Sequence, residues 1–216
     1  MAYYANWDYD TYRPHVLRRD TRIYWGAGNQ AQASGRCVGT FIGENPGAGH
    51  AAGQQTGWGI LVEGASKRPG DQTLRFLRDA WVAAVNTAGK SPPRDDDYIE
   101  VLNTYYFRCP ESGGQLQNWR ALGSRAIYFQ SIHRDAKFVI LGWGKVMNDS
   151  DECRDLLATL SGQPVIVSNV YGTVTVLPPP VRYPLPFYPA QPSAIARWGN
   201  SKTFFKNISG KLVSFV

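Results

Sequence analysis

The sequence predicts an α/β fold, in which a three-layer α/β/α sandwich is built around a central, four-stranded, mostly parallel sheet. The first observation is a set of four short apolar stretches rich in β-forming residues, at residues 37–42, 98–102, 137–141 and 164–168. The second is that helix-like patterns separate these stretches. The third is that polar residues do not alternate with apolar ones, which is typical of parallel strands covered on both faces.

The clearest predicted helix spans residues 71–89. Apolar residues recur there at the spacing of one helix face, Asp71 can cap the first turn, and Gly89 can end the last one. The apolar positions of this face are Leu74, Leu77, Trp81, Val82 and Val85. We also expect helices over residues 122–132 and 153–160.

Three of the predicted strands are followed by side chains that can bind a ligand. Asn45 comes after the first strand, Asn103 after the second and Trp143 after the third. In parallel α/β sheets, ligands bind outside the carboxyl ends of the strands. Residues 177–192 are rich in proline, which cannot continue a helix, so we expect an irregular loop across the same edge. The sequence therefore places a candidate site at this edge.

We expect residues 1–216 to form a single domain. A chain of 216 residues with 43% hydrophobic content can bury one sizeable core, whereas two domains would each be small. Residues 37–208 hold the predicted strands and form the core of this domain. Residues 1–36 mix aromatic, charged and glycine residues without clear periodicity and are interpreted as an N-terminal extension.

Composition narrows the possible partners. Cys37, Cys109 and Cys153 are widely spaced, so we expect neither a disulfide framework nor a zinc or iron–sulfur site, and no cofactor. No apolar run approaches the roughly 20 residues of a membrane span, and the first residues do not resemble a signal peptide, which predicts a soluble, cytoplasmic protein without a membrane partner. The formal net charge of +6 favours a polyanion such as nucleic acid.

Residues 41–47 read Phe-Ile-Gly-Glu-Asn-Pro-Gly and resemble the first motif of the uracil-DNA glycosylase superfamily, most closely the Gly-x-Asn-Pro-Gly of its mismatch-specific branch. Three further segments follow in the superfamily's order. They are a strand end and its continuation at residues 101–110, an apolar strand with Trp-Gly-Lys at 139–145, and a Gln-Pro-Ser loop at 191–197 with Ser-Lys-Thr at 201–203. The resemblance covers about residues 37–208 and implies a glycosylase fold and activity.

The resemblance implies catalytic roles for three residues. Asn45 matches the position whose Asp or Asn holds the attacking water, and Glu44 beside it is either a base or a capping side chain. Gln191 stands where the superfamily's closing motif has histidine, so it can donate a hydrogen bond but cannot act as a charged acid. A competing register aligns residues 188–190 with that motif. Because the Asn45 amide can orient water but is a poor base, the resemblance implies a mechanism that depends mainly on departure of the base.

The base pocket implied by the resemblance contains an amide, a stacking platform and an opening. Asn103 can read the edge of a flipped pyrimidine through two hydrogen bonds. Gly47 replaces a tyrosine that closes the pocket at pyrimidine C5 in the uracil-specific branch, which suggests a bulky C5-modified cytosine such as glucosylated 5-hydroxymethylcytosine in phage DNA. Other pocket residues are Gly43 and Pro46, with Trp58, Tyr105 and Phe107 as candidates for stacking on the base.

The expected partner is double-stranded DNA, bound by a monomer. Ile195 or Arg197 would fill the gap left by the flipped nucleotide. Phosphate contacts are expected from side chains that flank the loops: Ser193, Lys145, Lys202, Lys67, Arg68 and Lys206.

Two alternatives to this hypothesis remain open. One is a uracil or mismatch glycosylase of base-excision repair. The other is a catalytically weak module of the same fold that binds nucleic acid, an alternative that Gln191 in place of histidine favours. A Rossmann-type nucleotide enzyme fits the α/β pattern, but the sequence has neither Gly-x-Gly-x-x-Gly nor a phosphate-binding loop.

Overall fold

The structure is a computed structural model of residues 1–216. It describes residues 2–9, 16–26, 35–43, 50–51, 57–62, 72–103, 135–144, 151–160, 162–190, 192, 195 and 199–216, and the statements below concern these residues. None of the helices in this part of the chain has the length and apolar character needed to cross a membrane.

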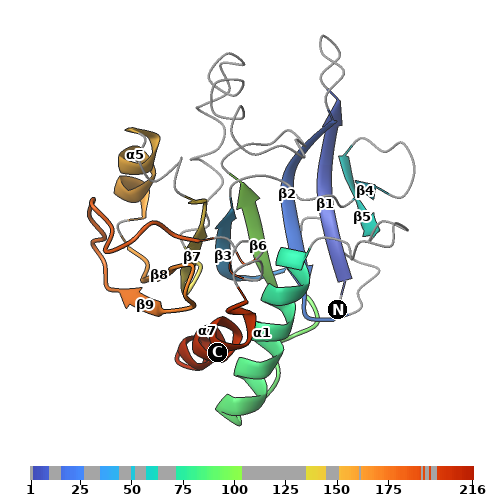
Figure 1. The fold of residues 1–216 in the computed structure, drawn as a ribbon. Helices are drawn as coiled ribbons and strands as arrows, with labels where there is room; N and C mark the ends of the chain where they lie inside the picture. Colours follow the sequence, from blue (N-terminus) through green and yellow to red (C-terminus); the bar gives the residue numbers. More distant parts are fainter. Residues whose placement is uncertain are drawn as a thin grey trace.

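Four parallel strands form the middle of a mixed sheet (Figure 1). They are β3 (Cys37–Gly43), β6 (Tyr98–Asn103), β7 (Val139–Gly142) and β8 (Val165–Ser168), arranged side by side in the order β6-β3-β7-β8. Every residue of these strands is buried. The four predicted strands are thus confirmed, and the continuous apolar runs reflect burial on both faces.

The prediction of only four strands is wrong, because five more strands extend the sheet. β2 (Val16–Tyr24) pairs antiparallel with β6, and β1 (Ala2–Tyr9) pairs antiparallel with β2. β5 (Gly57–Val62) and the short β4 (His50–Ala51) continue on that side, and β9 (Val174–Leu177) pairs antiparallel with β8 at the other edge. The described sheet therefore has nine strands in the order β4-β5-β1-β2-β6-β3-β7-β8-β9, and the fold is mixed α/β.

The first two strands lie in the segment that the sequence left without a pattern. β2 contains three arginines and an aspartate among its nine residues, so it shows neither the alternation nor the apolar run by which a strand is recognised. Its position is set by pairing with β6, from Thr21 opposite Val101 to Tyr24 opposite Tyr98. That pairing joins residues far apart in the chain, which a local pattern cannot reveal.

The predicted helix at residues 71–89 is confirmed as α1 (Gln72–Ala88). Its buried residues include Leu77 and Trp81, as the spacing predicts. Gly89 follows with φ of +62°, the left-handed conformation that commonly ends a helix and that glycine adopts without strain.

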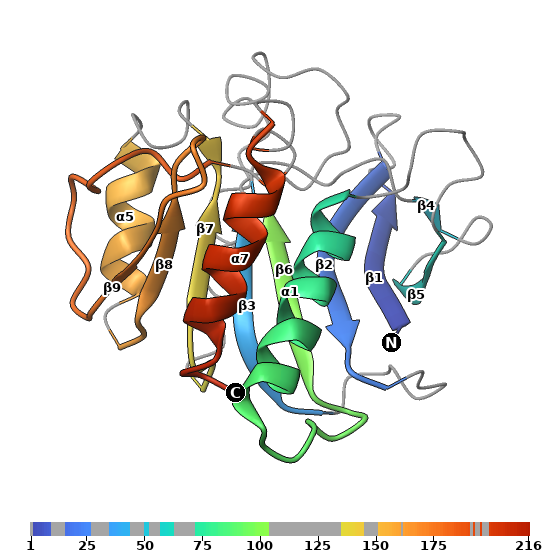
Figure 2. The same ribbon diagram turned by 60° about the horizontal axis from the view of Figure 1, so that its bottom comes forward.

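Two further helices complete the described fold. α5 (Asp151–Thr159) confirms the helix expected over residues 153–160, whereas α7 (Ser201–Leu212) was not expected. α1 and α7 lie side by side across one face of the sheet (Figure 2). Phe76 of α1 stacks on Phe204 of α7, with ring centroids 4.6 Å apart. The helix expected over residues 122–132 lies outside the described residues.

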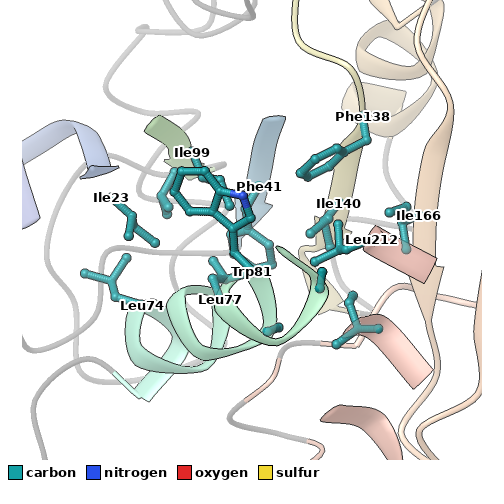
Figure 3. Packing of buried hydrophobic residues seen from close by; sticks show 14 of the residues in the cluster. Ile23, Phe41, Leu74, Leu77, Trp81, Ile99, Phe138, Ile140, Ile166 and Leu212 are labelled. Atoms are coloured by element: carbon teal, nitrogen blue, oxygen red, sulfur yellow. The ribbon is translucent and has the colours of Figure 1, made fainter. Parts of the chain in front are cut away.

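Successive residues of the central strands enter two different cores. Phe41 of β3 belongs to a cluster with residues of α1 and α7, whereas its neighbour Ile42 belongs to a cluster with α5 residues such as Leu156. This separation follows from the twofold alternation of side chains along a strand. Figure 3 shows the first cluster, in which Trp81 and Leu77 of α1 lie near Phe41. At β3, residues of α1 and α7 therefore pack on one face and residues of α5 on the other.

Candidate site at the carboxyl ends of the central strands

Three strand ends meet at the edge where the sequence places a site. Gly43, the last residue of β3, lies in register with Asn103 of β6 on one side and with Gly142 of β7 on the other. The proline-rich segment returns to this edge after β9, as expected. Its backbone is fixed there, because Gly144 N–H donates to the Pro189 carbonyl at 2.8 Å and Ala190 N–H donates to the Ser168 carbonyl at 2.7 Å.

The glycines at these strand ends leave space for one aromatic ring. A Cβ atom on Gly43 would lie 2.9 Å from Cε1 of Phe41, and a Cβ on Gly142 would lie 2.7 Å from Cζ of the same ring. Such separations are shorter than carbon atoms tolerate. The ring of Phe41 therefore occupies the space beside both strand ends. Phe41 and Gly142 were not predicted as site residues, although the sequence has a glycine at the end of two of the apolar strands.

Asn103 is a buried polar residue that pairs with Gly43, the last residue of β3. Its side-chain Oδ1 would be 3.2 Å from a Cβ on Gly43, so the missing side chain of Gly43 makes room for this amide. Asn103 is 3% exposed, and within the described part of the chain its Nδ2 has no hydrogen-bond partner. Leaving a buried donor unpaired costs about 1–3 kcal/mol. An acceptor on a ligand could recover this free energy.

Trp143 supplies a second buried donor just beyond β7. It is fully buried, and its indole Nε1 likewise lacks a hydrogen-bond partner among the residues that the structure describes. Trp143 packs in the cluster that includes α5, whereas Phe41 packs in the cluster that includes α1. Because side chains alternate along β6, Asn103 faces the same side as Val101 of the α1 cluster, so the two unsatisfied donors lie at the same sheet edge but on opposite faces.

Most of the other predicted site residues lie outside the described residues. They are Glu44, Asn45, Pro46, Gly47, Lys67, Arg68, Tyr105, Phe107, Lys145, Gln191, Ser193 and Arg197. The structure describes the strand ends from which two of the predicted segments start. Gly43 immediately precedes residues 44–47, and Ala190 immediately precedes Gln191, so both segments start from the same edge.

Trp58 lies on a strand that is three positions away from β6 in the sheet. It is part of β5, which is separated from β6 by β1 and β2. With about 4.8 Å between adjacent strands, the backbones of β5 and β6 are roughly 14 Å apart. The sheet does not bring Trp58 next to Asn103, and we do not retain it as a platform for the base.

Ile195 does not suit the role of a wedge in DNA. It is fully buried and belongs to the cluster that includes α1 and α7, so its side chain does not reach the surface. Its carbonyl accepts a hydrogen bond from Asn200 N–H at 3.2 Å, just before α7 begins. Of the two wedge candidates, only Arg197 is retained. Lys202 and Lys206 are exposed on α7, as a phosphate contact requires.

Comparisons of the chain with protein-family models, with curated proteins and with solved structures found no match. The fold and the site together define a mixed α/β protein with a candidate ligand site at the carboxyl ends of β3, β6 and β7.

Proposed function

We propose that the protein is a DNA glycosylase of the uracil-DNA glycosylase type, which flips out a modified pyrimidine and hydrolyses its N-glycosidic bond. One observation carries the proposal: the unsatisfied, buried amide of Asn103 lies beside Gly43, the residue that leads into the Glu-Asn-Pro-Gly sequence. A base-reading amide and a water-holding loop need this proximity. Helices on both faces of the sheet also agree with the three-layer sandwich that the resemblance implies.

The chemistry assigns one task to each residue. As the bond between C1′ and the base nitrogen breaks, its electron pair goes to the base and positive charge develops on the sugar. Asn45 orients a water that adds to C1′ and then loses a proton. Gln191 donates a hydrogen bond to the departing base, which gains a proton as it leaves. Asn103 accepts from the amino group of a cytosine and donates to its ring nitrogen.

The favoured substrate is a cytosine with a bulky C5 group, such as glucosylated 5-hydroxymethylcytosine in phage DNA. Gly47 has no side chain to close the pocket at C5. The residues that follow, 48–57, are mostly small or polar, which agrees with a large polar adduct. Hydrolysis of such a nucleotide leaves an abasic site.

The test is a base-release assay on matched duplexes containing glucosylated 5-hydroxymethylcytosine, 5-hydroxymethylcytosine, uracil or only unmodified bases. Alkali cleaves the strand at abasic sites, and mass spectrometry identifies the free base. We expect release of the glucosylated base, with Asn45→Ala and Asn103→Ala each reducing the rate by about 10²–10³-fold, as removal of a transition-state contact does in other enzymes.

The matched control is Asn86→Ala, which removes an exposed amide on α1 and should leave the rate unchanged. Undiminished activity in Asn45→Ala would overturn its assignment as the water-holding residue. Absence of abasic sites on every duplex would overturn the glycosylase proposal. Rapid release of uracil with the glucosylated base left intact would instead support a repair glycosylase.

A second candidate function is binding without catalysis, and Gln191 in place of histidine favours it. In that case the protein would retain the modified duplex without releasing a base. Binding to the same four duplexes, measured at several salt concentrations, separates the two functions. Contact with several phosphates predicts that affinity falls steeply with salt.

A further inference from the structure

A cavity of about 190 Å³ lies at the end of the sheet opposite the candidate site. Val38 lines it near the start of β3, Phe138 lines it just before β7, and Asp97 lines it just before β6. These are the amino ends of the same strands whose carboxyl ends form the candidate site. In Figure 2 this end lies near the label that marks the C-terminus. The cavity is therefore a second place at which a ligand can bind, independent of the proposed glycosylase function.

The floor of the cavity is apolar. Trp81 and Val85 come from α1, Phe138 precedes β7, and Phe215 follows α7. Trp81 and Phe138 are both almost completely buried, and Figure 3 shows them on α1 and at the sheet, respectively. An apolar cavity of about 150 Å³ is large enough to bind benzene. This floor can therefore accept one ring or a short aliphatic chain.

One wall of the cavity is held rigidly. Asp97 accepts two hydrogen bonds from the Arg36 side chain, at 3.1 and 2.8 Å, and one from Arg94 N–H at 3.1 Å. Its backbone N–H donates to the Arg94 carbonyl, and its carbonyl accepts from Trp25 N–H, each at 2.9 Å. A ligand that binds here does not have to order this wall, which favours affinity.

The rim of the cavity is mainly basic. Arg36, Lys90, Arg94 and Lys137 line it, whereas Asp97 is the acidic residue among the lining residues that the structure describes. Asp97 is already neutralised by its contacts with the two arginines. Lys137 is exposed, and no salt bridge to an acidic residue is seen for it in the described part of the chain. A free positive charge therefore stands beside an apolar floor.

We propose that this cavity binds a small molecule that joins an apolar body of about the size of benzene to one anionic group. The apolar body lies against Phe215, the partly exposed aromatic residue of the floor, and the anionic group lies at the rim near Lys137. Burial of the ring supplies most of the affinity, and the lysine selects for the negative charge.

The test compares two probes of nearly the same shape by ¹⁹F NMR titration of the full chain. One probe is 4-fluorophenylacetate, which is anionic, and the other is 4-fluorophenylacetamide, which is neutral. For about eleven heavy atoms, a dissociation constant on the order of 1 mM is a realistic expectation. We expect saturable binding of the acetate and binding of the amide at least about fivefold weaker, a preference in the range of an exposed charge contact.

Two charge reversals locate the anion. Lys137→Glu should weaken acetate binding by about tenfold and leave amide binding unchanged. Arg182→Glu likewise replaces a positive by a negative charge at an exposed site that does not line the cavity, and it should alter neither affinity. Far-ultraviolet circular dichroism of both variants checks that they are folded.

Three results would overturn the proposal. They are equal affinities for acetate and amide, an equal loss of affinity in Lys137→Glu and Arg182→Glu, and absence of saturable binding of both probes. None of them bears on base release, so failure of this proposal is distinguishable from failure of the glycosylase proposal.

Discussion

At the scale of single residues, Asp97 shows how a buried charge is stabilised. Burial by itself raises the pKa of this carboxyl group, but the hydrogen bonds from Arg36 and from Arg94 N–H, with the charges of both arginines, outweigh it. The pKa of Asp97 is therefore lowered from its ordinary value of 3.8. A lowered pKa in the folded state means that stabilisation is complete above the unfolded-state pKa and is lost as pH falls through the folded-state pKa.

This shift predicts a pH-dependent effect of Asp97→Asn. We expect the variant to lower the free energy of unfolding by about 1–3 kcal/mol at pH 7, because it removes a buried, charge-assisted pair. The difference from the unmodified protein should narrow below about pH 4. Urea unfolding at pH 7 and pH 3 measures it.

The control for this prediction is Asp151→Asn. The Asp151 side chain is 81% exposed and lies 3.3 Å from Arg154, so its removal should cost less than about 1 kcal/mol. A difference for Asp97→Asn that is equally large at both pH values would contradict the assigned pKa.

The site residues differ in how far the sequence could predict them. Asn103 was predictable, because a polar residue directly after an apolar strand is a local signal. Phe41 was not, since its role depends on glycines in two different strands. The Arg36–Asp97 pair joins residues 61 positions apart, so no local sequence pattern indicates it either. Local patterns thus predict what stands at a strand end but not what packs beside it.

At the scale of elements, the entry into β3 depends on a glycine. Gly35 has φ of +113°, and a Cβ atom there would lie 2.1 Å from the Asp96 carbonyl oxygen. The close approach brings the chain past residues 94–97 and positions Arg36 for its pair with Asp97. Because the obstacle is backbone, a rotamer change elsewhere cannot remove the clash.

We therefore expect Gly35→Ala to destabilise the protein strongly, by about 3 kcal/mol or more, since strained backbone and a clash add together. Gly89→Ala is the matched control, because Gly89 also has positive φ but has open space around its Cβ position. It should cost only about 1 kcal/mol. Thermal unfolding measures the loss of stability in both variants. Equal losses of stability would show that the clash at Gly35 is relieved.

The helices and strands also differ in whether a local sequence pattern could predict them. α1 was predictable to within a residue or two, because one face carries regularly spaced apolar residues and Gly89 marks the end. α7 was missed, although Phe204, Ile208 and Leu212 are buried at helical spacing. β1 and β2 lacked any local signal, and their pairing alone defines them.

At the scale of the whole molecule, the N-terminal strands share the core of the central sheet. Ile23 of β2 is fully buried in the same cluster as Leu74 and Leu77 of α1. Tyr3 of β1 also belongs to this cluster. Residues 1–36 were interpreted as an extension, but part of this segment forms strands of the sheet and contributes side chains to its core.

Ile23→Ala tests that conclusion. Removing a fully buried side chain should lower the free energy of unfolding by about 2–5 kcal/mol and shift the single transition of the whole protein. The control Val82→Ala shortens a partly buried residue of α1 and should cost less than about 1.5 kcal/mol. An unchanged main transition in Ile23→Ala would mean that β2 unfolds separately.

The position of β3 has a consequence for the order in which the protein folds. β3 lies between β6 and β7, yet it precedes both in the chain. During synthesis it emerges from the ribosome before either neighbour exists, and its buried residues then have no partner strand. Pairing with β6 closes one side first and can recruit α1, β1 and β2, whereas the other side stays open until β7 arrives. A nascent chain stalled at a point where β6 has left the ribosome but β7 has not should therefore bind chaperones that recognise an apolar strand edge.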